Sequence, residues 1–376
     1  MKMMYATTIR YPSLLANRKQ ILAMSRAFIG ELGDQFVLAG IRLDFSDSAE
    51  SILPQNTFEL GEASLPVLAW RVVQAVKKQG ITDVYCREKR LLTLVHALCC
   101  VFLPGKVNFF YEIHAFPVAW TLDAAYERYL SLFRLRRVFV TAHLQERYEK
   151  VYHIAKGTSG KVLPDAVDLK VFGKNLLMSD CRARIGIAES DWVIGYVGRL
   201  KTLGMDKGVG LLLRALQQWG KKKPVRLLVV GGSPEEITEY SAMATSLGVK
   251  DVVDFVPSVA QSELPTYLQA CDMLAMPFPE SEHFNYYMSP LKLFEYMASR
   301  RPIIATNLPS IREILTTETN AILVPPEDES AFLRAMECLM NDQGFAEQIA
   351  ERAYQDVQAY TWEKRVHAII HDEKAF

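Results

Sequence analysis

The hydrophobic pattern of this chain alternates between short apolar runs and longer amphipathic segments, and it does so in two series. The apolar runs of the first series are rich in β-branched and aromatic residues, which favours strands. These predicted strands are MMYATTI, QFVLAGI, DVYC, KVNFFYEI, RVFVT and KVLPDAV. Apolar residues recur at helical spacing between several of them, which predicts helices over 16–32, 65–78, 89–100 and 124–135.

The second series follows residues 169–191, which have no strong strand pattern and end in polar residues. Its predicted strands are WVIGYVG, VRLLVVGG, VVDFV, DMLAMP, PIIAT and AILVP. Its predicted helices cover 208–219, 263–270, a segment that begins near Ser289, 310–315 and most of the remaining chain.

Strands that alternate with helices through short connections predict parallel sheets with helices on both faces. The fold class is therefore α/β, with two Rossmann-like, doubly wound domains that face each other across a cleft. We place the first domain at 1–172 and the second at 173–358. Ligands of such sheets bind beyond the carboxyl ends of the strands. The loops after WVIGYVG, VRLLVVGG, DMLAMP and KVNFFYEI are thus the candidate sites.

The segment from Tyr287 to Ala298, YMSPLKLFEYMA, carries the clearest chemistry. Ser289 is a favourable N-cap and Pro290 a favourable first helical residue. The free amide groups and the positive end of the helix dipole then suit an anion. Lys292 and Glu295 follow at three-residue spacing on the same face. Amide donors and a cation for phosphates, with a carboxylate for sugar hydroxyls, indicate a nucleotide-sugar site.

Several motifs resemble one known family. The second half resembles the retaining glycosyltransferases of family 4 (glycosyltransferase group 1), which have the GT-B fold, and within them a subgroup with the SPLKLFEYMA motif. The segments that are similar, in order, are GYVGRLKTLGMDKG, RLLVVGGSPEE, SPLKLFEYMASRRPIIATNLPSIREIL and AILVPPEDESAF. YEIHAFP and VLPDAVDLKVF in the first half resemble the same family more weakly. YTWEKR resembles the family's terminal helix, which implies that 359–376 packs back on the first domain.

The resemblance implies roles for individual residues. In the donor domain, it implies binding of the nucleoside diphosphate sugar by Arg199, Lys207, Gly231, Ser289, Pro290, Leu291, Lys292 and Glu295, with Glu295 on the ribose. The catalytic set that it implies is His114, Glu112, Arg199 and Lys207. For the acceptor, the polar residues that the first domain offers are Asn17, Gln20 and Arg87. The turn over 255–258 would flank the base.

The chain departs from the family pattern at two places. The common signature has two glutamates separated by seven residues, and here Glu295 is the second while Tyr287 holds the place of the first. Glu280, Glu282 or His283 on the same loop could substitute for it. The first N-terminal loop, RYPSLLANRKQ, lacks the usual pair of glycines.

The reaction implied is transfer of a sugar from a UDP- or GDP-sugar to an acceptor hydroxyl with retention, the acceptor being a lipid-linked or cell-surface glycan precursor. No Asp-x-Asp triplet occurs in the sequence, so we expect no metal and no other cofactor. Arg199, Lys207, Lys292 and the helix end would stabilise the charge of the leaving group.

Composition adds limits on partners and location. The net charge is zero, which gives no support to a nucleic-acid-binding role. Six cysteines without CxxC spacing, and the absence of a signal-peptide pattern or a long apolar run, predict a cytoplasmic protein. The five histidines outside the candidate sites show no metal spacing, namely His96, His143, His153, His367 and His371.

Two basic clusters are open to two interpretations. Arg134, Arg136 and Arg137 alternate with apolar residues, and Arg18 and Lys19 begin another helix. They are either solvated helix faces or a surface for peripheral contact with an anionic membrane.

Other functions on the same architecture also stay open. An epimerase would convert the sugar nucleotide without an acceptor, a phosphorylase would need inorganic phosphate, and a NAD oxidoreductase is disfavoured because no GxGxxG follows the first strand. A catalytically degenerate protein that binds the sugar nucleotide or acts as a scaffold is favoured only by Tyr287. The donor base and sugar, the acceptor and the oligomeric state are not specified by the sequence.

Overall fold

The computed structural model describes residues 1–11, 16–45, 52, 54–116, 121–202, 204–220 and 224–371. The chain forms two compact units, the first made of Met1–Pro164 with Trp362–Phe376 and the second of Asp165–Thr361. The division lies before residue 172, the boundary expected from the sequence, because Val167 and Phe172 pack in the apolar core of the second unit.

The first unit is built on a parallel sheet in the order β5-β3-β1-β6-β7-β8-β9. The strands are β1 Met3–Ala6, β3 Phe36–Gly40, β5 Thr57–Glu59, β6 Asp83–Cys86, β7 Asn108–Ile113, β8 Arg136–Phe139 and β9 Lys161–Val162. The strands β1, β3 and β6 are buried along their whole length, as expected for a sheet that is covered on both faces. A separate pair of short strands is formed by β2 Arg10–Tyr11 and β4 Arg42–Leu43.

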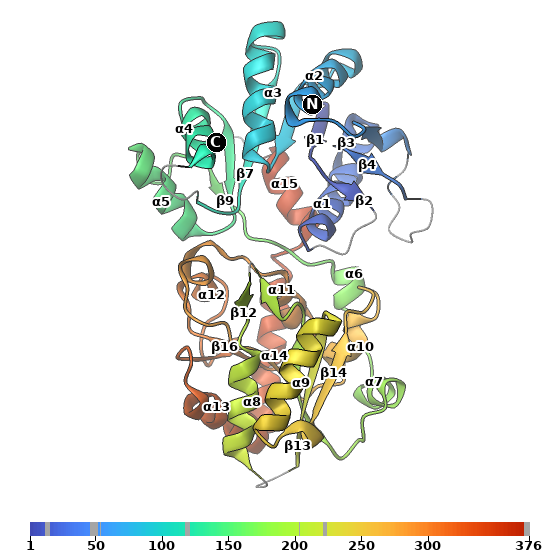
Figure 1. The fold of residues 1–376 in the computed structure, drawn as a ribbon, viewed down its shortest axis with the longest axis vertical. Coiled ribbons are helices and arrows are strands. Elements are labelled where there is room, and N and C mark those ends of the chain that lie inside the picture. The colour runs from blue at the N-terminus through green and yellow to red at the C-terminus, as the bar shows by residue number, and fades with distance from the viewer. Residues whose placement is uncertain are drawn as a thin grey trace. The chain divides into compact units, whose positions relative to one another are not determined.

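Within the described residues, six α-helices belong to the first unit. They are α1 Ala16–Leu32, α2 Leu65–Gln79, α3 Lys89–Phe102, α4 Leu122–Ser131, α5 Ala142–Tyr152 and α15 Trp362–His371. Helices α4 and α5 begin at threonine N-caps, since the Thr121 hydroxyl accepts from Ala124 N and the Thr141 hydroxyl from Leu144 N. The C-terminal helix α15 packs beside α1 (Figure 1).

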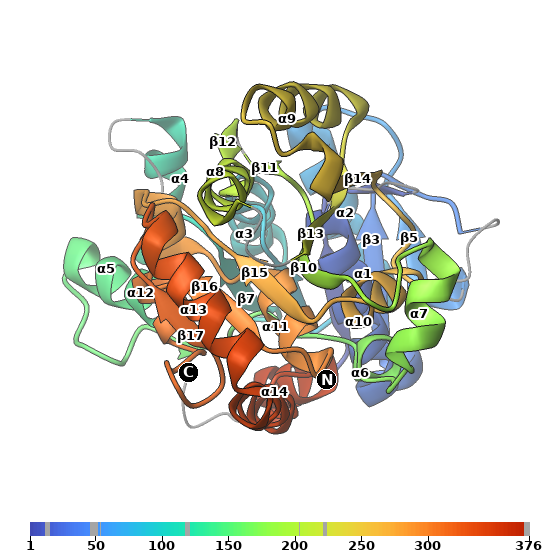
Figure 2. The ribbon, with the colours of Figure 1, turned by 90° about the horizontal axis from the view of Figure 1, so that it is seen from below.

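The second unit has a parallel sheet in the order β14-β13-β10-β15-β16-β17, which Figure 2 shows from one edge strand to the other. Its strands are β10 Trp192–Val197, β13 Val225–Gly232, β14 Val253–Pro257, β15 Met273–Met276, β16 Ile303–Thr306 and β17 Ile322–Val324. Alternate residues point to opposite faces, so Ile194 and Tyr196 lie in one apolar core while Val193 and Val197 lie in another.

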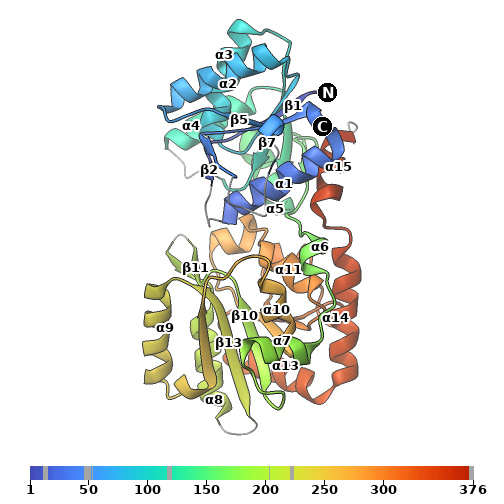
Figure 3. The ribbon, with the colours of Figure 1, turned by 90° about the vertical axis from the view of Figure 1, so that its right-hand side faces the viewer.

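Helices cover both faces of the second sheet. Figure 3 shows α9 and α14 on opposite sides of β10 and β13. The helices are α6 Leu169–Phe172, α7 Met178–Ile185, α8 Val209–Trp219, α9 Pro234–Ser246, α10 Leu264–Gln269, α11 Leu291–Ala298, α12 Pro309–Arg312, α13 Glu329–Asn341 and α14 Gln343–Val357. A hairpin of β11 Lys201–Thr202 and β12 Met205–Asp206 follows β10, and a π-helical turn, η4 His283–Tyr287, precedes α11.

The predicted α/β class, with a doubly wound parallel sheet in each unit, is confirmed, and the strand orders locate the sites. In the second sheet the chain moves outward from β10 to β13 and β14, then returns to the other side of β10 with β15. The first sheet reverses in the same way at β1 and β6. Ligands of doubly wound sheets bind where the order reverses, beyond the carboxyl ends of these strands. None of the helices in the described ranges is long and apolar enough to cross a bilayer.

Candidate functional site

The carboxyl ends of β10 and β15 meet around the side chain of Lys292, which comes from α11. Its Nζ lies 3.7 Å from the ring centroid of Tyr196, near the end of β10, and 5.4 Å from that of Phe278, which follows β15. A Cβ atom at Gly198 would lie 2.9 Å from Lys292 Cε and 3.2 Å from Nζ. The glycine, with φ of +137°, therefore leaves the space that the lysine side chain occupies.

Lys292 is a buried amine without a hydrogen-bond acceptor in the described part of the chain. The residue is 6% exposed. Burial lowers its pKa well below the usual value, the positive charge of Lys207 lowers the pKa further, and the charge of Glu295 opposes this. Buried polar groups in folded proteins nearly always have a partner. The orphaned amine at the switch point therefore indicates a ligand with acceptor oxygens.

A second lysine points to the same aromatic ring. The Nζ of Lys207, which follows β12, lies 5.9 Å from the ring centroid of Phe278. Burial and then the charge of Arg199 lower the pKa of Lys207 to about 8. Burial and the charge of Lys207 also lower the pKa of His283. Nitrogen groups that disfavour one another's protonation in this way form a site suited to an anion.

The start of α11 differs from the sequence prediction. The N-cap is Pro290, in an extended conformation with ψ of 127°, and the helix begins at Leu291 without a side-chain cap. Ser289 is not the N-cap, because its hydroxyl accepts a hydrogen bond of 2.8 Å from Asp165 N. The predicted cap is therefore wrong by one residue, and Leu291 and Lys292 lie in the first turn of a helix that has no side-chain cap.

Glu295 lies on α11 one turn after Lys292 and is half-buried. Tyr287, which stands where the resembled family has a glutamate, donates a hydrogen bond of 2.8 Å to Glu282. Glu282 is therefore linked to this tyrosine, and Glu280 is exposed.

Gly231 has a structural reason to be glycine. Its φ is +117°, and a Cβ atom there would lie 2.7 Å from the carbonyl oxygen of Gly198. The residue thus lets the ends of β13 and β10 approach each other at the switch point.

The switch point of the first unit adjoins a buried polar cluster at the end of β7. The Oε1 atom of Glu112 lies 2.6 Å from His114 Nε2 and 3.1 Å from Arg365 Nη2, and Tyr85 donates its hydroxyl to Oε2. Burial raises the pKa of Glu112, but the charges of Arg365 and His114 outweigh it and hold the pKa well below the usual value. The predicted pair Glu112 and His114 is therefore a hydrogen-bonded unit with an ionised carboxylate.

The structure also brings two predicted acceptor residues together. Arg87, directly after β6, donates a hydrogen bond of 2.8 Å to the side-chain oxygen of Gln20 on α1. Thr7, after β1, donates to Glu88 at 2.6 Å. The side chain of Asn17 lies outside the described residues.

The basic cluster 134–137 is divided between surface and interior. Arg137 is 5% exposed and donates to the carbonyl oxygens of Leu130 and Phe133. It is a structural residue and is not part of a basic surface, which corrects the sequence interpretation. Arg134 is exposed and Arg136 is half-buried. The side chain of Arg18 lies outside the described residues.

Sequence reasoning missed Arg365 and the two aromatic neighbours of Lys292. Arg365 is 253 residues from its partner Glu112, and no local pattern connects them. Tyr196 lies near the end of the apolar strand β10 and Phe278 two residues after β15, so in the sequence both resemble ordinary core residues. Only the position of both strands beside the switch point distinguishes them.

Comparison of the sequence with known families matches a segment of the second unit. The family described as "Glycosyl transferases group 1" matches residues 191–342. D-inositol 3-phosphate glycosyltransferase of Corynebacterium urealyticum is 29% identical over 231 residues, which cover 59% of this chain and 52% of that protein. The protein of the same name from Salinispora arenicola is 26% identical over 60% of this chain and 51% of its own. The chain spans about half the length of the curated relatives it matches.

Comparison of the folds covers the whole chain. Sucrose-phosphate synthase from Thermosynechococcus elongatus superposes with a TM-score of 0.75 at 18% identity, covering 97% of this chain and 96% of that one. The Anabaena protein HepE in complex with UDP gives a TM-score of 0.75 at 18% identity, with full coverage of both chains. HepE with UDP-glucose gives 0.72, again at 18% identity and with full coverage of both chains. These neighbours have the GT-B fold, and this chain shares it.

Proposed function

We propose that the protein transfers a sugar from a nucleoside diphosphate sugar to an acceptor hydroxyl, because residues 191–342 match the family described as "Glycosyl transferases group 1" and the chain shares the GT-B fold. The observation that carries the proposal is the buried amine of Lys292 at the switch point of the second sheet, which has no hydrogen-bond partner among the described residues. Lys207 lies over the same aromatic ring, that of Phe278. HepE, which has the same fold, is known in complex with UDP and with UDP-glucose.

In the proposed donor site, the diphosphate lies at the carboxyl ends of β10 and β15. Lys292 and Lys207 donate hydrogen bonds to its oxygens, Arg199 adds a guanidinium, and the first turn of α11 adds backbone amides. Glu295 holds the ribose hydroxyls. When the sugar departs, negative charge grows on the same oxygens, so these donors stabilise the transition state more than the ground state. No metal ion is needed for this role.

We propose that the reaction retains the anomeric configuration. The bond between the sugar C1 and the phosphate oxygen breaks, the bond from C1 to the acceptor oxygen forms on the same face, and the acceptor proton passes to the departing phosphate. His114, Gln20 and Arg87 of the first unit are the proposed acceptor-side groups. A lipid-linked or cell-surface glycan precursor is the proposed acceptor.

The donor assignment is tested by a thermal-shift screen with UDP, GDP, ADP and their sugars. A nucleotide that binds the folded chain raises its melting temperature by mass action, and the base that responds identifies the donor. We expect the shift to be larger at pH 7 than at pH 9. The pKa of Lys207 is about 8, so raising the pH through this value removes the positive charge that binds the anion. Affinity should fall roughly tenfold over this range, since the charge of the diphosphate changes little between these pH values.

A chain that melts at the same temperature with every nucleotide contradicts the donor site. A shift as large at pH 9 as at pH 7 contradicts the role of Lys207. Turnover separates the remaining functions: an epimerase converts the responding sugar nucleotide without acceptor, and a degenerate protein binds it without releasing nucleoside diphosphate.

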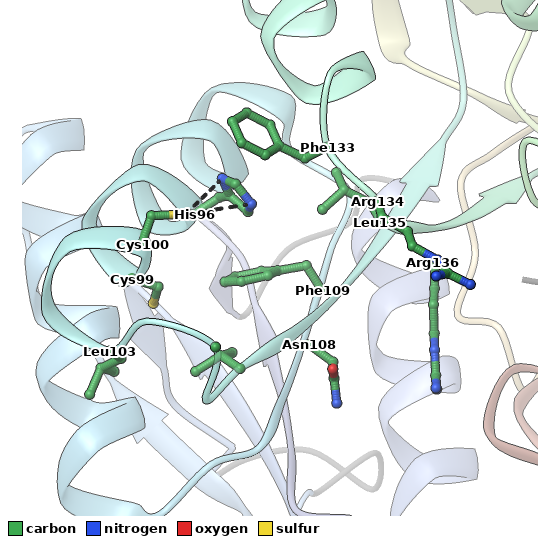
Figure 4. A pocket seen from close by; sticks show the side chains of 12 residues that line it. His96, Cys99, Cys100, Leu103, Asn108, Phe109, Phe133, Arg134, Leu135 and Arg136 are labelled. Carbon is green, nitrogen blue, oxygen red and sulfur yellow. Dashed lines mark hydrogen bonds between the residues drawn. The ribbon is translucent and has the colours of Figure 1, made fainter. Parts of the chain in front are cut away.

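We also propose contact between the first unit and an anionic membrane. The loop after α4 and the end of α3 enclose a cavity of about 490 Å³. Figure 4 shows Phe109 and Phe133 among its walls, and it shows Arg134 and Arg136 on the β8 side. The neighbouring apolar side chains are largely exposed, namely Val101 at 71%, Phe102 at 54% and Leu132 at 75%. Exposed apolar groups next to basic ones suit an interface with acidic headgroups.

Vesicle co-sedimentation tests this contact. The chain should bind vesicles that contain phosphatidylglycerol more tightly than pure phosphatidylcholine vesicles. Arg134→Glu should weaken the binding by at least about fivefold, because one basic residue contributes on the order of 1 kcal/mol, and Leu132→Ser should weaken it too. Arg184→Glu and Leu177→Ser change exposed residues of the second unit and serve as matched controls. Equal losses in variants and controls would refute the surface.

A further inference from the structure

Two histidines on α15 and a glutamate on α1 form a cluster on the surface of the first unit. His367 and His371 are four residues apart, so they lie one above the other on one helix face. Glu31 Oε1 lies 3.2 Å from His367 Nδ1 and 2.6 Å from His371 Nε2. The two imidazole rings have centroids 4.5 Å apart. One possible ligand atom from each residue lies within 4.8 Å of the others.

The chemistry of this cluster matches that of a transition-metal site. Paired histidines at this helical spacing with one carboxylate are ligands that Zn²⁺ accepts, and imidazole suits Zn²⁺, Ni²⁺ and Cu²⁺ in general. Two ligands on a tetrahedral Zn²⁺ are roughly 3.4 Å apart, given bond lengths near 2.1 Å. The distances to Glu31 approach this value. Small rotations would suffice, and the side chains of His367 and His371 are 65% and 52% exposed.

We propose that Glu31, His367 and His371 bind a divalent transition-metal ion, with Zn²⁺ as the preferred ion and water as the fourth ligand. The ion would join α1 to α15, two segments that contribute to the same unit from opposite ends of the chain. It would lie on the same helix as Arg365, whose buried side chain contacts Glu112. The ion would therefore connect the two helices, and its binding does not depend on sugar transfer.

The sequence analysis assigned no metal spacing to His367 and His371 because the carboxylate beside them is remote in the chain. Glu31 is 336 residues from His367. Two histidines at helical spacing without a third ligand are common on solvated helices, and only the packing of α15 on α1 supplies the third.

Calorimetric titration of the full, tag-free and chelator-treated chain with ZnCl₂ tests the proposal. We expect one ion per chain, with a dissociation constant in the micromolar range, and a rise of a few degrees in melting temperature with saturating Zn²⁺. Co²⁺ should give visible absorption bands of tetrahedral intensity without the charge-transfer bands of a thiolate ligand. The double variant His367→Asn/His371→Gln, which keeps hydrogen-bonding capacity toward Glu31, should bind at least tenfold more weakly.

The control is His143→Asn/His153→Asn, which removes two other histidines of the first unit and should leave the affinity unchanged. A parent chain that shows no saturable binding overturns the proposal. So does binding that survives the His367/His371 double variant. Binding that is lost only after alkylation of the exposed Cys100 and Cys338 overturns it as well, since those thiols would then be the ligands.

Discussion

The variant Lys292→Met is expected to melt at a higher temperature than the parent chain and, at the same time, to lose its response to nucleoside diphosphates. A buried amine without an acceptor destabilises the ligand-free protein, whether it is charged or neutral. Methionine has a similar length, fills the space beside Gly198 and packs on Tyr196 and Phe278 without a polar group. The gain in the free energy of unfolding should be about 1–3 kcal/mol.

The loss of binding follows from the same side chain. A hydrogen bond from an ammonium group to a phosphate oxygen contributes about 1.5–3 kcal/mol. Affinity for the responding nucleoside diphosphate should therefore fall on the order of 10- to 100-fold. Opposite effects on stability and binding distinguish a residue kept for its ligand from one kept for the fold.

Lys250→Met provides the matched control. Lys250 also has its Nζ over an aromatic ring, 5.1 Å from the Phe255 centroid, but it is exposed. Its replacement should leave both the melting temperature and the nucleotide response close to those of the parent. A Lys292→Met chain that melts lower than the parent and still binds the nucleotide would show that the lysine is a core residue and not a ligand group.

Local chemistry explains what the sequence could predict. The central strands β1, β3, β6, β15 and β16 were recognisable because each is an apolar run buried along its whole length. Their alternation with helices was enough to specify the fold class. The start of α11 was placed near Ser289 and Pro290 from cap preferences. The exact cap was wrong, because the serine hydroxyl is used by Asp165, a residue far away in the sequence.

Contacts between distant segments explain what the sequence could not predict. Lys292 was expected to be a cation near a helix end, yet its burial arises from Tyr196 and Phe278 on two other segments. Gly231 was expected to approach a ligand, and the structure adds a second constraint, its close approach to Gly198. Such features need the register of the strands, which residue patterns along one segment do not give.

The variant Arg365→Met is expected to destabilise the first unit by about 3–5 kcal/mol, because it leaves the Glu112 carboxylate buried without its main counter-charge. Arg365 and Glu112 have side chains that are 2% and 1% exposed, with 3.1 Å between Nη2 and Oε1. Arg365 also donates to the carbonyl oxygens of Leu163 and Pro164, so it joins α15 to the chain after β9. Urea unfolding followed by circular dichroism measures the loss.

The double variant Glu112→Gln/Arg365→Met should recover a large part of that stability, since removing both charges of a buried pair costs much less than removing one. Arg10→Met is the surface control: Arg10 pairs with Glu62 at 2.8 Å, but both side chains are mostly exposed. The melting temperature of the Arg10→Met chain should stay near that of the parent. An Arg365→Met chain as stable as the parent would show that Glu112 has another sufficient partner.

The loss of unfolding free energy caused by Arg365→Met should become smaller as the pH falls. In the parent, the pKa of Glu112 is held well below its usual value, so the stability it contributes is present above the unfolded pKa and is lost only in acid. Without Arg365, burial dominates and raises the folded-state pKa, so the folded variant binds a proton more readily than the unfolded chain. The free energy of unfolding of the variant then rises as the pH falls from 8 toward 5, and its difference from that of the parent becomes smaller. A gap that stays constant over this range would mean that Arg365 stabilises the unit through its contacts with the carbonyl oxygens and Met24 rather than through the charge of Glu112.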